Sequence, residues 1–587
     1  MSMLASLAHA YERMAEKGDV PPFGYSNEKI GFLISLDEDG SPVSVIDLRE
    51  GKSKKKRPRH MAVPQPVKRT SGIAPNFLWD KTSYVLGITA GGGKRLAEEH
   101  AAFLERHRQA LFETDDPGLR AFWRFLERWT PEDFERLGWP EDMKDQNIVF
   151  ALEGDRRHNI RIHDRPAARA LWDRMQSDCN KTEAMCLVSG KRAPVSRLHP
   201  AIKGVWDAQS SGASIVSFNL DAFTSCGHEQ GDNAPVSEET AFAYTTVLNK
   251  FLERDSGHRV QIGDASTVFW ADGSDADIAE GIFSAMIEGA RDEIDERSEA
   301  KKVGTILNKL RAGKRLKDFD PGLAKGVRFY VLGLAPNAAR LSVRFWFEGD
   351  FGTLAENYLR FMADMEIAPR TDHEAHAPLW RYLVETAAMR KRENVPPNLA
   401  GEWLRAILAG TRYPLTLLSN VLMRLRADKH INALRVAMLK AVLIRNYKME
   451  VPVALDPDNT NKGYLLGRLF AAYEQTQSAA LGGRVNATVK DKFYGAASAQ
   501  PRKVFALLES NSANHLSKVG KRAPGYKVTL EKVIGGIMDL MSPSDDPFPP
   551  SLSSEQQALF GLGYYHQRNA FFKSKTDETP ISEEAHK

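Results

Sequence analysis

Amide and hydroxyl side chains gather between residues 204 and 249, in a segment with few charges. An amide presents a hydrogen-bond donor beside an acceptor, which matches the edge of a nucleobase. Glycines among these residues allow a backbone to approach a ligand closely. We therefore predict a recognition surface that matches base edges, rather than a catalytic centre. Its candidate residues are Gln209, Ser210, Ser211, Asn219, Gln230 and Asn233.

Two basic clusters precede this segment, and the first has six positive charges within residues 52–59. Cations fix phosphates in place, while hydroxyls and amides reach base edges. We predict phosphate binding by Lys54, Lys55, Lys56, Arg57, Lys68 and Arg69. The neighbouring Thr70, Ser71 and Asn76 would serve both tasks. A solvated loop is the alternative for the first cluster, and a turn or capping contact is the alternative for each amide or hydroxyl.

Further cations lie in the second half of the chain. Arg340 and Arg344 stand four residues apart on a predicted strand, where a period of two places both on one face. They either meet an RNA or DNA backbone or pair with nearby acids. Two predicted helices carry a second set, which is Arg424, Arg426, Lys429, Arg435, Lys440 and Arg445. This helical face is either simply solvated or a nucleic-acid surface.

Catalytic motifs are weakly supported. Gly87 and the Gly93-Lys94 pair lie too far apart for a phosphate loop, and Arg95 replaces the magnesium-binding hydroxyl. Cys179 and Cys186 are too widely spaced for a typical zinc pair. The sequence contains neither His-Glu-x-x-His nor Gly-x-Ser-x-Gly. We expect no enzymatic activity, metal or cofactor; the enzymatic alternative is a nuclease with an unrecognised carboxylate site.

Composition is that of a globular protein. The 587 residues are 42% hydrophobic and 27% charged, and 80 basic residues against 76 acidic ones give a net charge of +4. This length predicts about three or four domains. Three cysteines indicate a reducing compartment, and no apolar run approaches the roughly 20 residues of a membrane span. Residues 1–18 predict an amphipathic helix rather than a signal peptide, so we expect a cytoplasmic protein without membrane contact.

Two structural regimes are predicted. Up to about residue 350, strands at 30–36, 43–48, 84–88, 148–152, 268–271, 328–334 and 341–347 alternate with helices near 95–129, 166–176, 237–253 and 277–297. Beyond it, helical periodicity covers 354–366, 377–390, 398–409, 415–427, 430–447, 463–480, 500–518, 526–541 and 553–572. We predict a mixed, largely antiparallel α+β portion followed by an all-α helical bundle. The expected domains are 1–350, 351–460 and 461–587.

Several long stretches resemble the large subunit of type I-C CRISPR surveillance complexes, called Cascade. They are VKRTSGIAPNFLWD, DAQSSGASIVSFN, GHEQGDNAPVSEETAFAYTTVLN, QIGDASTVFWA, APNAARLSVRFW, ADKHINALRVAMLKA, GYLLGRLFAAYEQTQ, NATVKDKFYGAASAQP and FGLGYYHQR. Together they span nearly the whole chain. The sequence departs from the family at Asp207, where a glycine is expected.

The resemblance implies a non-catalytic subunit that recognises the protospacer-adjacent motif in duplex DNA and promotes unwinding and R-loop formation. It also implies that the subunit holds the displaced single strand and helps to recruit a helicase-nuclease in antiviral defence. The implied partners are guide RNA, target double-stranded DNA, other Cascade backbone subunits and small subunits. The family's C-terminal helical region is also made separately as the small subunit, here from roughly residue 465 onward.

These implications allow roles to be assigned as hypotheses. The amide and hydroxyl pool would contact the motif or wedge the duplex, the two upstream clusters would hold duplex phosphates, and the helical cations would hold the displaced strand. The alternative is a purely structural scaffold that bridges guide-RNA-binding subunits.

Overall fold

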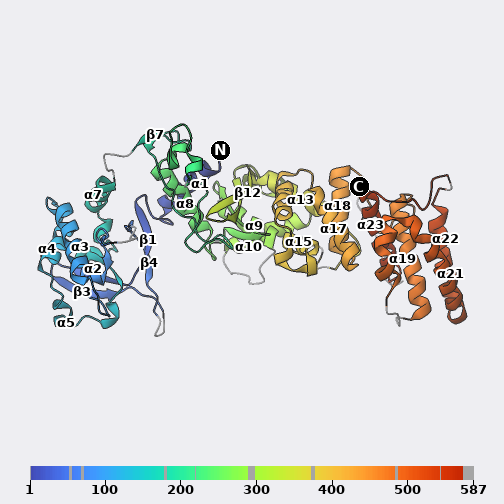
Figure 1. Ribbon diagram of the computed structural model, residues 1–587, viewed down its shortest axis with the longest axis horizontal. Coiled ribbons are helices and arrows are strands. Elements are labelled where there is room, and N and C mark those ends of the chain that lie inside the picture. Colours follow the sequence, from blue (N-terminus) through green and yellow to red (C-terminus); the bar gives the residue numbers. More distant parts are fainter. Residues whose placement is uncertain are drawn as a thin grey trace. The chain divides into compact units, whose positions relative to one another are not determined.

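The computed structural model describes residues 2–51, 56–67, 72–176, 182–218, 220–288, 298–371, 374, 377–482, 487–542 and 544–572. The chain forms two compact units (Figure 1). Unit 1 comprises Met1–Pro200 and Val216–Lys250, and unit 2 comprises Ala201–Ile215 and Phe251–Lys587. The chain therefore passes from one unit to the other at three points.

Unit 1 contains a four-stranded sheet with strand order β3-β2-β6-β5. Its strands are β2 (Phe32–Leu36), β3 (Pro42–Asp47), β5 (Asp80–Lys81) and β6 (Asn147–Leu152). β2 pairs with β3 in the predicted antiparallel hairpin and with β6 in parallel. All five residues of β2 are buried, because the sheet has apolar side chains on both faces.

A second pair of strands extends unit 1. β1 (Tyr25–Ile30) pairs antiparallel with β4 (Arg59–Pro64), and Ile30 joins Met61 and Val63 in a small core against the sheet. The larger core on the other face is covered mainly by α3 (Leu96–Leu111) and α4 (Pro117–Arg128). The remaining helices around this sheet are α2 (Thr82–Val85), α5 (Asp133–Arg136), α6 (Glu153–Arg156) and α7 (Pro166–Gln176).

The rest of unit 1 is built around α1 (Met3–Lys17) and most of α8 (Glu238–Phe251). α1 is the predicted amphipathic helix; Ser2 caps its first turn and Gly18 ends it with a left-handed φ of 78°. Tyr11 of α1 meets Phe242 of α8 edge to face at 5.7 Å. β7 (Glu183–Met185) and β8 (Arg192–Pro194) form a short antiparallel ribbon in this part.

Unit 2 begins with a four-stranded antiparallel sheet of order β12-β11-β10-β9. Its strands are β9 (Arg259–Ile262), β10 (Ala265–Asp272), β11 (Arg328–Asn337) and β12 (Arg340–Asp350). Helices α9 (Ala276–Glu288), α10 (Ser298–Arg311), α11 (Leu316–Phe319) and α12 (Pro321–Lys325) lie between β10 and β11 in the chain.

Beyond β12 the described residues of unit 2 are helical, as predicted (Figure 1). The helices are α13 (Phe351–Asp364), α15 (Leu379–Thr386), α16 (Pro397–Ala409), α17 (Leu415–Asp428), α18 (Ala433–Tyr447), α19 (Lys462–Leu481), α20 (Val489–Ala499), α21 (Phe505–Arg522), α22 (Pro524–Asp539) and α23 (Ser554–Ala570). This confirms the predicted mixed α+β portion followed by a helical portion. One continuous core runs from Val260 of the sheet to Tyr565 of α23.

Glycines bring α19 and α23 into backbone contact. A Cβ on Gly467 would lie 2.1 Å from the Phe560 carbonyl oxygen, and a Cβ on Gly563 would lie 2.1 Å from the Tyr464 carbonyl oxygen. Any larger residue at either position would push the two helices apart.

Two sequence-based expectations differ from the structure. The strand predicted at 84–88 is wrong, because α2 is helical from Thr82 to Val85. Helix α20 was not predicted, although Thr488 and Asp491 form a capping box at its start. The domain boundaries expected at 350 and 460 stay a prediction. Among the described residues, no helix is both long and apolar enough to span a membrane.

Candidate nucleic-acid interface

Residues 201–215 form a loop that belongs to unit 2, although the chain on both sides of it belongs to unit 1. Ile202 and Ala213 close the loop by exchanging backbone hydrogen bonds of 2.8 and 2.9 Å. Ser214 then pairs in parallel with Arg340, and the Leu341 amide donates to the Ser214 carbonyl oxygen at 2.9 Å. The loop is therefore fixed to the start of β12.

Two glycines shape this loop through their own close contacts. Gly204 has a φ of 84°, and a Cβ there would lie 3.0 Å from the Leu252 carbonyl oxygen. Gly212 has a φ of 93°, and its Cβ would lie 2.9 Å from that of Ala201. Asp207, where the family resemblance leads us to expect glycine, also has a positive φ of 60°. The backbone there favours glycine because a Cβ is crowded in this region.

The tip of the loop presents three uncharged polar side chains from the predicted pool. Gln209, Ser210 and Ser211 are all exposed, and the Gly212 amide donates to the Gln209 carbonyl oxygen at 2.9 Å to close a turn. The structure thus places these residues together on a backbone that is held at both ends. Such a tip can offer donors and acceptors to a base edge.

A hollow of about 620 Å³ lies beside this tip, between residues 204–210 and residues 252–261 of unit 2. Arg254 is exposed at its edge. Arg259 is half-buried, and its Nη1 donates to the Leu252 carbonyl oxygen at 3.1 Å. Burial lowers the pKa of Arg259, and the charge of Arg254 adds to that effect. Asp207 and Glu253 line the same hollow, so its two cations are matched by two carboxylates. Arg254 is the exposed cation there that can meet a phosphate.

Trp206 lines the same hollow and is 60% exposed, which is unusual for so large an apolar side chain. Its backbone amide donates to Ser266 Oγ at 2.9 Å, so the main chain beneath the ring is fixed. An exposed indole is a platform on which a base can stack. Our sequence analysis missed Trp206, Arg254 and Arg259; an aromatic residue in an otherwise small and polar run was the available signal.

The second predicted loop lies in unit 1, and its amides bind within the protein. Gln230 Oε1 accepts from Arg197 Nε at 3.1 Å. Asn233 Nδ2 donates to the carbonyl oxygens of His228 and Gln230, each at 3.1 Å. These contacts match the turn and capping alternative, so the loop has less free hydrogen-bonding capacity than the tip at Gln209.

Much of the upstream basic segment lies outside the described residues. This applies to Lys54, Lys55, Lys68, Arg69, Thr70 and Ser71, and in the amide pool to Asn219. Lys56 Nζ bonds Asp47 Oδ2 at 2.7 Å, while Arg57 is exposed and its backbone pairs with Glu50.

Asn76 requires a correction. It is 4% exposed, its Oδ1 accepts from the Val67 amide at 3.0 Å, and its own amide donates to Asp80 Oδ2 at 2.8 Å. A side chain buried in this way ties two segments of unit 1 together. It does not present an amide to a base edge.

The two arginines of β12 differ from their predicted arrangement. A bulge interrupts the pairing of β11 with β12 between Arg340 and Arg344, so the strict alternation of faces that places both together does not hold. Arg344 Nη2 bonds Asp264 Oδ2 at 2.6 Å, which is the ion-pair alternative. Arg340 is half-buried in the strand that holds the recognition loop.

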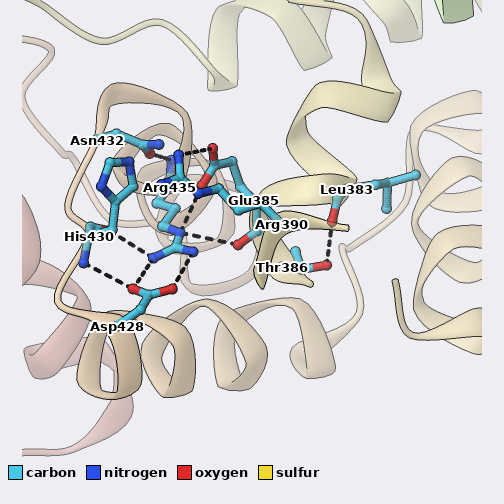
Figure 2. A network of polar contacts seen from close by, with 8 residues as sticks. All are labelled: Leu383, Glu385, Thr386, Arg390, Asp428, His430, Asn432 and Arg435. Carbon is cyan, nitrogen blue, oxygen red and sulfur yellow. Dashed lines mark hydrogen bonds and ion pairs between the residues drawn. The ribbon is translucent and has the colours of Figure 1, made fainter. Parts of the chain in front are cut away.

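Arg435 in α18 is not on a nucleic-acid surface. It is fully buried, and its guanidinium bonds Asp428 Oδ1 at 2.6 Å and Glu385 Oε2 at 3.0 Å. Figure 2 shows the guanidinium between these two carboxylates, where Arg435 Nη1 also donates to the His430 carbonyl oxygen at 2.8 Å. Burial raises the pKa of the Asp428 carboxyl, but the bonds from Arg435 outweigh it and the net pKa is lowered. This arginine joins α15, α17 and α18.

Lys440 and Arg445, also in α18, are buried too. Arg445 Nη2 bonds Asp364 Oδ2 at 2.6 Å and its guanidinium lies 4.6 Å from the centre of the Tyr413 ring. Lys440 Nζ donates to the Asp364 carbonyl oxygen at 3.3 Å, and burial lowers its pKa. The predicted displaced-strand role is therefore wrong for Arg435, Lys440 and Arg445, because their charges are used inside the helical core.

The other three cations of that set remain accessible. Arg426 is exposed, and Arg424 and Lys429 are half-buried, all at the C-terminal end of α17. Arg426 lies beside Gly495 of α20, a helix that also carries the exposed Lys492. A smaller basic surface therefore survives where α17 meets α20.

Cysteines and acids give no metal centre in the described part of the chain, since no group of three or more potential ligands occurs there. Cys186 is buried, and its Sγ accepts from the amides of Ser237 and Ser189 at 3.3 and 3.4 Å. Burial raises the pKa of its thiol, but these hydrogen bonds outweigh burial and the pKa falls to about 6. The thiol thus holds the β7–β8 turn against the start of α8.

The described geometry therefore consists of a polar tip, an aromatic ring, two cations and two carboxylates around a hollow. The family model described as CRISPR-associated protein (Cas_Csd1) matches residues 7–572. The chain belongs to the Csd1 family of CRISPR-associated proteins. No curated protein sequence matches it significantly.

Membership of the Csd1 family indicates a subunit of a Cascade-type CRISPR complex, which works with nucleic acids. The exposed tip at Gln209 and the hollow at Trp206 present amide, hydroxyl, indole and guanidinium groups. Of the predicted pool, Gln209, Ser210 and Ser211 are the members that the structure leaves exposed and groups together.

Proposed function

We propose that this Csd1-family chain is the non-catalytic large subunit of a type I-C surveillance complex. It recognises the protospacer-adjacent motif in duplex DNA and opens the duplex next to it. It also holds the displaced strand and helps to recruit the helicase-nuclease. The observation that carries the proposal is the exposed Gln209-Ser210-Ser211 tip, fixed beside the exposed Trp206 and the cation Arg254.

The chemistry of guided recognition supports this assignment. Base pairing with the guide reads most of the target, so the protein needs only a few contacts to a short flanking motif. An amide and two hydroxyls can supply them, and a cation beside them can fix a phosphate. An exposed indole can stack on a base that leaves the duplex. Exchange of DNA–DNA for RNA–DNA pairs is nearly neutral in energy, so such weak contacts are sufficient to favour opening.

The test compares guide complexes assembled with and without the full-length chain. Their affinity for duplexes with every flanking trinucleotide is measured at two salt concentrations. We expect omission of the chain to abolish both duplex binding and the flanking preference. A preference that survives omission would support the alternative, a scaffold that bridges guide-RNA-binding subunits.

Point variants then test the tip itself. Gln209→Ala with Ser210→Ala and Ser211→Ala is compared with Asn308→Ala and Thr353→Ala, which remove exposed polar groups elsewhere in unit 2. We expect the tip variant to lose discrimination between flanking sequences by about tenfold or more, since one good base contact contributes about 1–3 kcal/mol. Unchanged discrimination would show that the tip does not read the motif.

A further inference from the structure

A second hollow in unit 2, of about 810 Å³, lies away from the recognition loop in the fold, between α10, α11 and α13. Gly313 ends α10 with a φ of 77°, and its amide donates to the Leu310 carbonyl oxygen at 2.9 Å. The chain turns there and enters α11, which packs against α13. The turn, the two helices and the segment after α13 thus enclose one concave surface.

Cations dominate the lining of this hollow. It contains five of them, namely Arg311, Arg315, Lys317, Arg360 and Arg370, against the two carboxylates Glu356 and Glu366. Glu356 is already used, because its Oε1 lies 3.5 Å from Lys317 Nζ. None of the four arginines forms an ion pair with any described residue. Arg311 Nε is buried and has no hydrogen-bond partner among the described residues.

Local helix electrostatics explain only part of this arrangement. Arg311 stands in the last turn of α10, where backbone carbonyls attract a cation. Arg360 on α13 and Arg370 beyond it have no such reason to face the same hollow. Five cations face two carboxylates, and one of these carboxylates is paired with Lys317, so the excess positive charges repel one another and a bound anion would relieve the repulsion.

The floor of the hollow is apolar. Leu310 is buried, and Leu359 and Met362 are half-buried side chains that pack on the main core. Arginines and apolar side chains in one hollow suit a ligand with regularly spaced phosphates and flat hydrophobic groups, which describes a single nucleic-acid strand. An acidic protein segment would offer carboxylates, which arginine also binds in a bidentate way. It would not offer the flat bases that suit the apolar part of the lining.

We propose that this hollow, lined by Arg311, Arg315, Arg360 and Arg370, binds the phosphate backbone of a single nucleic-acid strand. The inference rests on the proposed function, in which both guide RNA and a displaced DNA strand are present. It moves strand binding away from α18, whose cations are buried, to a surface whose four arginines form no ion pair within the described residues.

Salt dependence of binding tests the phosphate contacts on the full-length chain. The variant Arg315→Gln with Arg360→Gln removes two exposed cations of the hollow. The matched control, Lys325→Gln with Arg405→Gln, removes two exposed cations of unit 2 outside it. Affinities for oligothymidylate and oligouridylate are measured over a range of salt concentrations. The slope of log K against log salt should flatten by about 1.4 in the hollow variant, at about 0.7 per lost contact, and stay unchanged in the control.

Equal slopes for the hollow variant and the control, with both strands, would overturn the proposal. A photo-cross-linking residue at Ala363, an exposed position in the hollow, then distinguishes the sources in the assembled complex. Cross-links to labelled guide RNA or to the labelled displaced strand support the proposal and identify the ligand. Cross-links only to protein overturn it in favour of an acidic segment. The same group at exposed Ala409 is the control.

The two proposals fail in different ways. The hollow variant should retain its preference among flanking sequences, because the tip at Gln209 is unchanged. A hollow variant whose salt slope equals that of the control, with the flanking preference intact, would reject only the strand-binding hollow. A flattened slope in the hollow variant, with no flanking preference that depends on this chain, would reject only motif recognition.

Discussion

Arg426 and Arg435 lie at similar distances in sequence from the turn between α17 and α18, but one is exposed and the other is buried. Arg426 is exposed to solvent, whereas Arg435 is enclosed between two carboxylates (Figure 2). The first is free to meet a phosphate, and the second holds three helices together. Charge type alone does not separate these roles, because burial decides which partner a guanidinium meets.

Substitution should reveal this difference. Arg435→Met removes the nearer partner of the buried Glu385 and leaves it only Arg390 at 3.8 Å, so we expect the free energy of unfolding to fall by about 3 kcal/mol. Arg426→Ala should change it by less than about 0.5 kcal/mol, since that side chain is exposed. Urea denaturation followed by tryptophan fluorescence measures both. Similar values for the two variants would contradict the structural role of Arg435.

His107 provides a residue-level source of acid sensitivity in unit 1. Its Nδ1 lies 2.8 Å from the Phe103 carbonyl oxygen, and its Nε2 accepts from the Leu78 amide at 2.9 Å. This pair of contacts requires the neutral ring with hydrogen on Nδ1. Burial lowers its pKa to about 3.

Because the unfolded chain takes up this proton near pH 6.5 and the folded chain does not, His107 stabilises the fold above that pH. This stabilisation is lost progressively as the pH falls from about 6.5 towards 3. By pH 5 the loss in the free energy of unfolding is about 2 kcal/mol. Unfolding midpoints at pH 7 and pH 5 measure the loss. His107→Gln should be less stable at pH 7 but lose less stability on acidification, and an unchanged pH dependence would argue against this mechanism.

At the scale of elements, most helices and strands could be predicted from periodicity. The β2–β3 hairpin, β6, β10, β11, β12 and the helices of the second half lie close to their expected ranges. Residues 84–88 failed because a short apolar run does not distinguish a strand from a buried helical turn. The buried cations of α18 could have been recognised, since ALRVAMLKAVLIRNY is apolar on every side and such a helix is enclosed.

The candidate site could be predicted only in part. The run from Gln209 to Ser211 was recognised from its residue types, and the structure exposes it. Trp206 and Arg254 join it through contacts between segments that are distant in sequence, which no local pattern specifies. The hollow at Arg360 could not be predicted for the same reason, because the fold brings its cations together from three separate segments of the chain.

Two glycine-to-alanine substitutions should change the stability of the chain in opposite directions, because one glycine lies in the contact between α19 and α23 and the other does not. Gly467→Ala places a Cβ against the Phe560 carbonyl oxygen and should cost about 1–3 kcal/mol or more. Gly536→Ala, in α22, meets nothing within 4 Å and should stabilise its helix by about 0.5–1 kcal/mol. Thermal unfolding of the full chain measures both. A Gly467→Ala variant as stable as Gly536→Ala would contradict the close packing.

At the scale of the whole molecule, the C-terminal helices share their core with the sheet of unit 2. The separate small-subunit product implied by the family resemblance was expected from roughly residue 465, which lies inside α19. Starting there would remove the Asn461 cap and Tyr464. It would also remove the bond between the Tyr464 hydroxyl and His566 Nδ1 at 2.9 Å.

A fragment that begins at Met449 should therefore be more stable than one that begins at Leu465. It keeps residues 456–461 and the 2.8 Å bond from Arg468 Nη1 to the Pro457 carbonyl oxygen. Loss of the cap alone costs about 1 kcal/mol. Circular dichroism of the two fragments during heating measures the difference. Equal midpoints would show that the segment before α19 does not support the C-terminal helices.

The bridge from Ser214 to Arg340 also sets an order of events during synthesis. The ribosome makes the recognition loop well before the strand that anchors it, and at typical elongation rates the interval is on the order of ten seconds. During that interval the backbone groups that later pair with β12 must remain bonded to water or to a chaperone. The surface that we assign to motif reading is thus completed only after the sheet of unit 2 has emerged. An unfinished chain would contain the recognition residues without the loop conformation that pairing with β12 fixes.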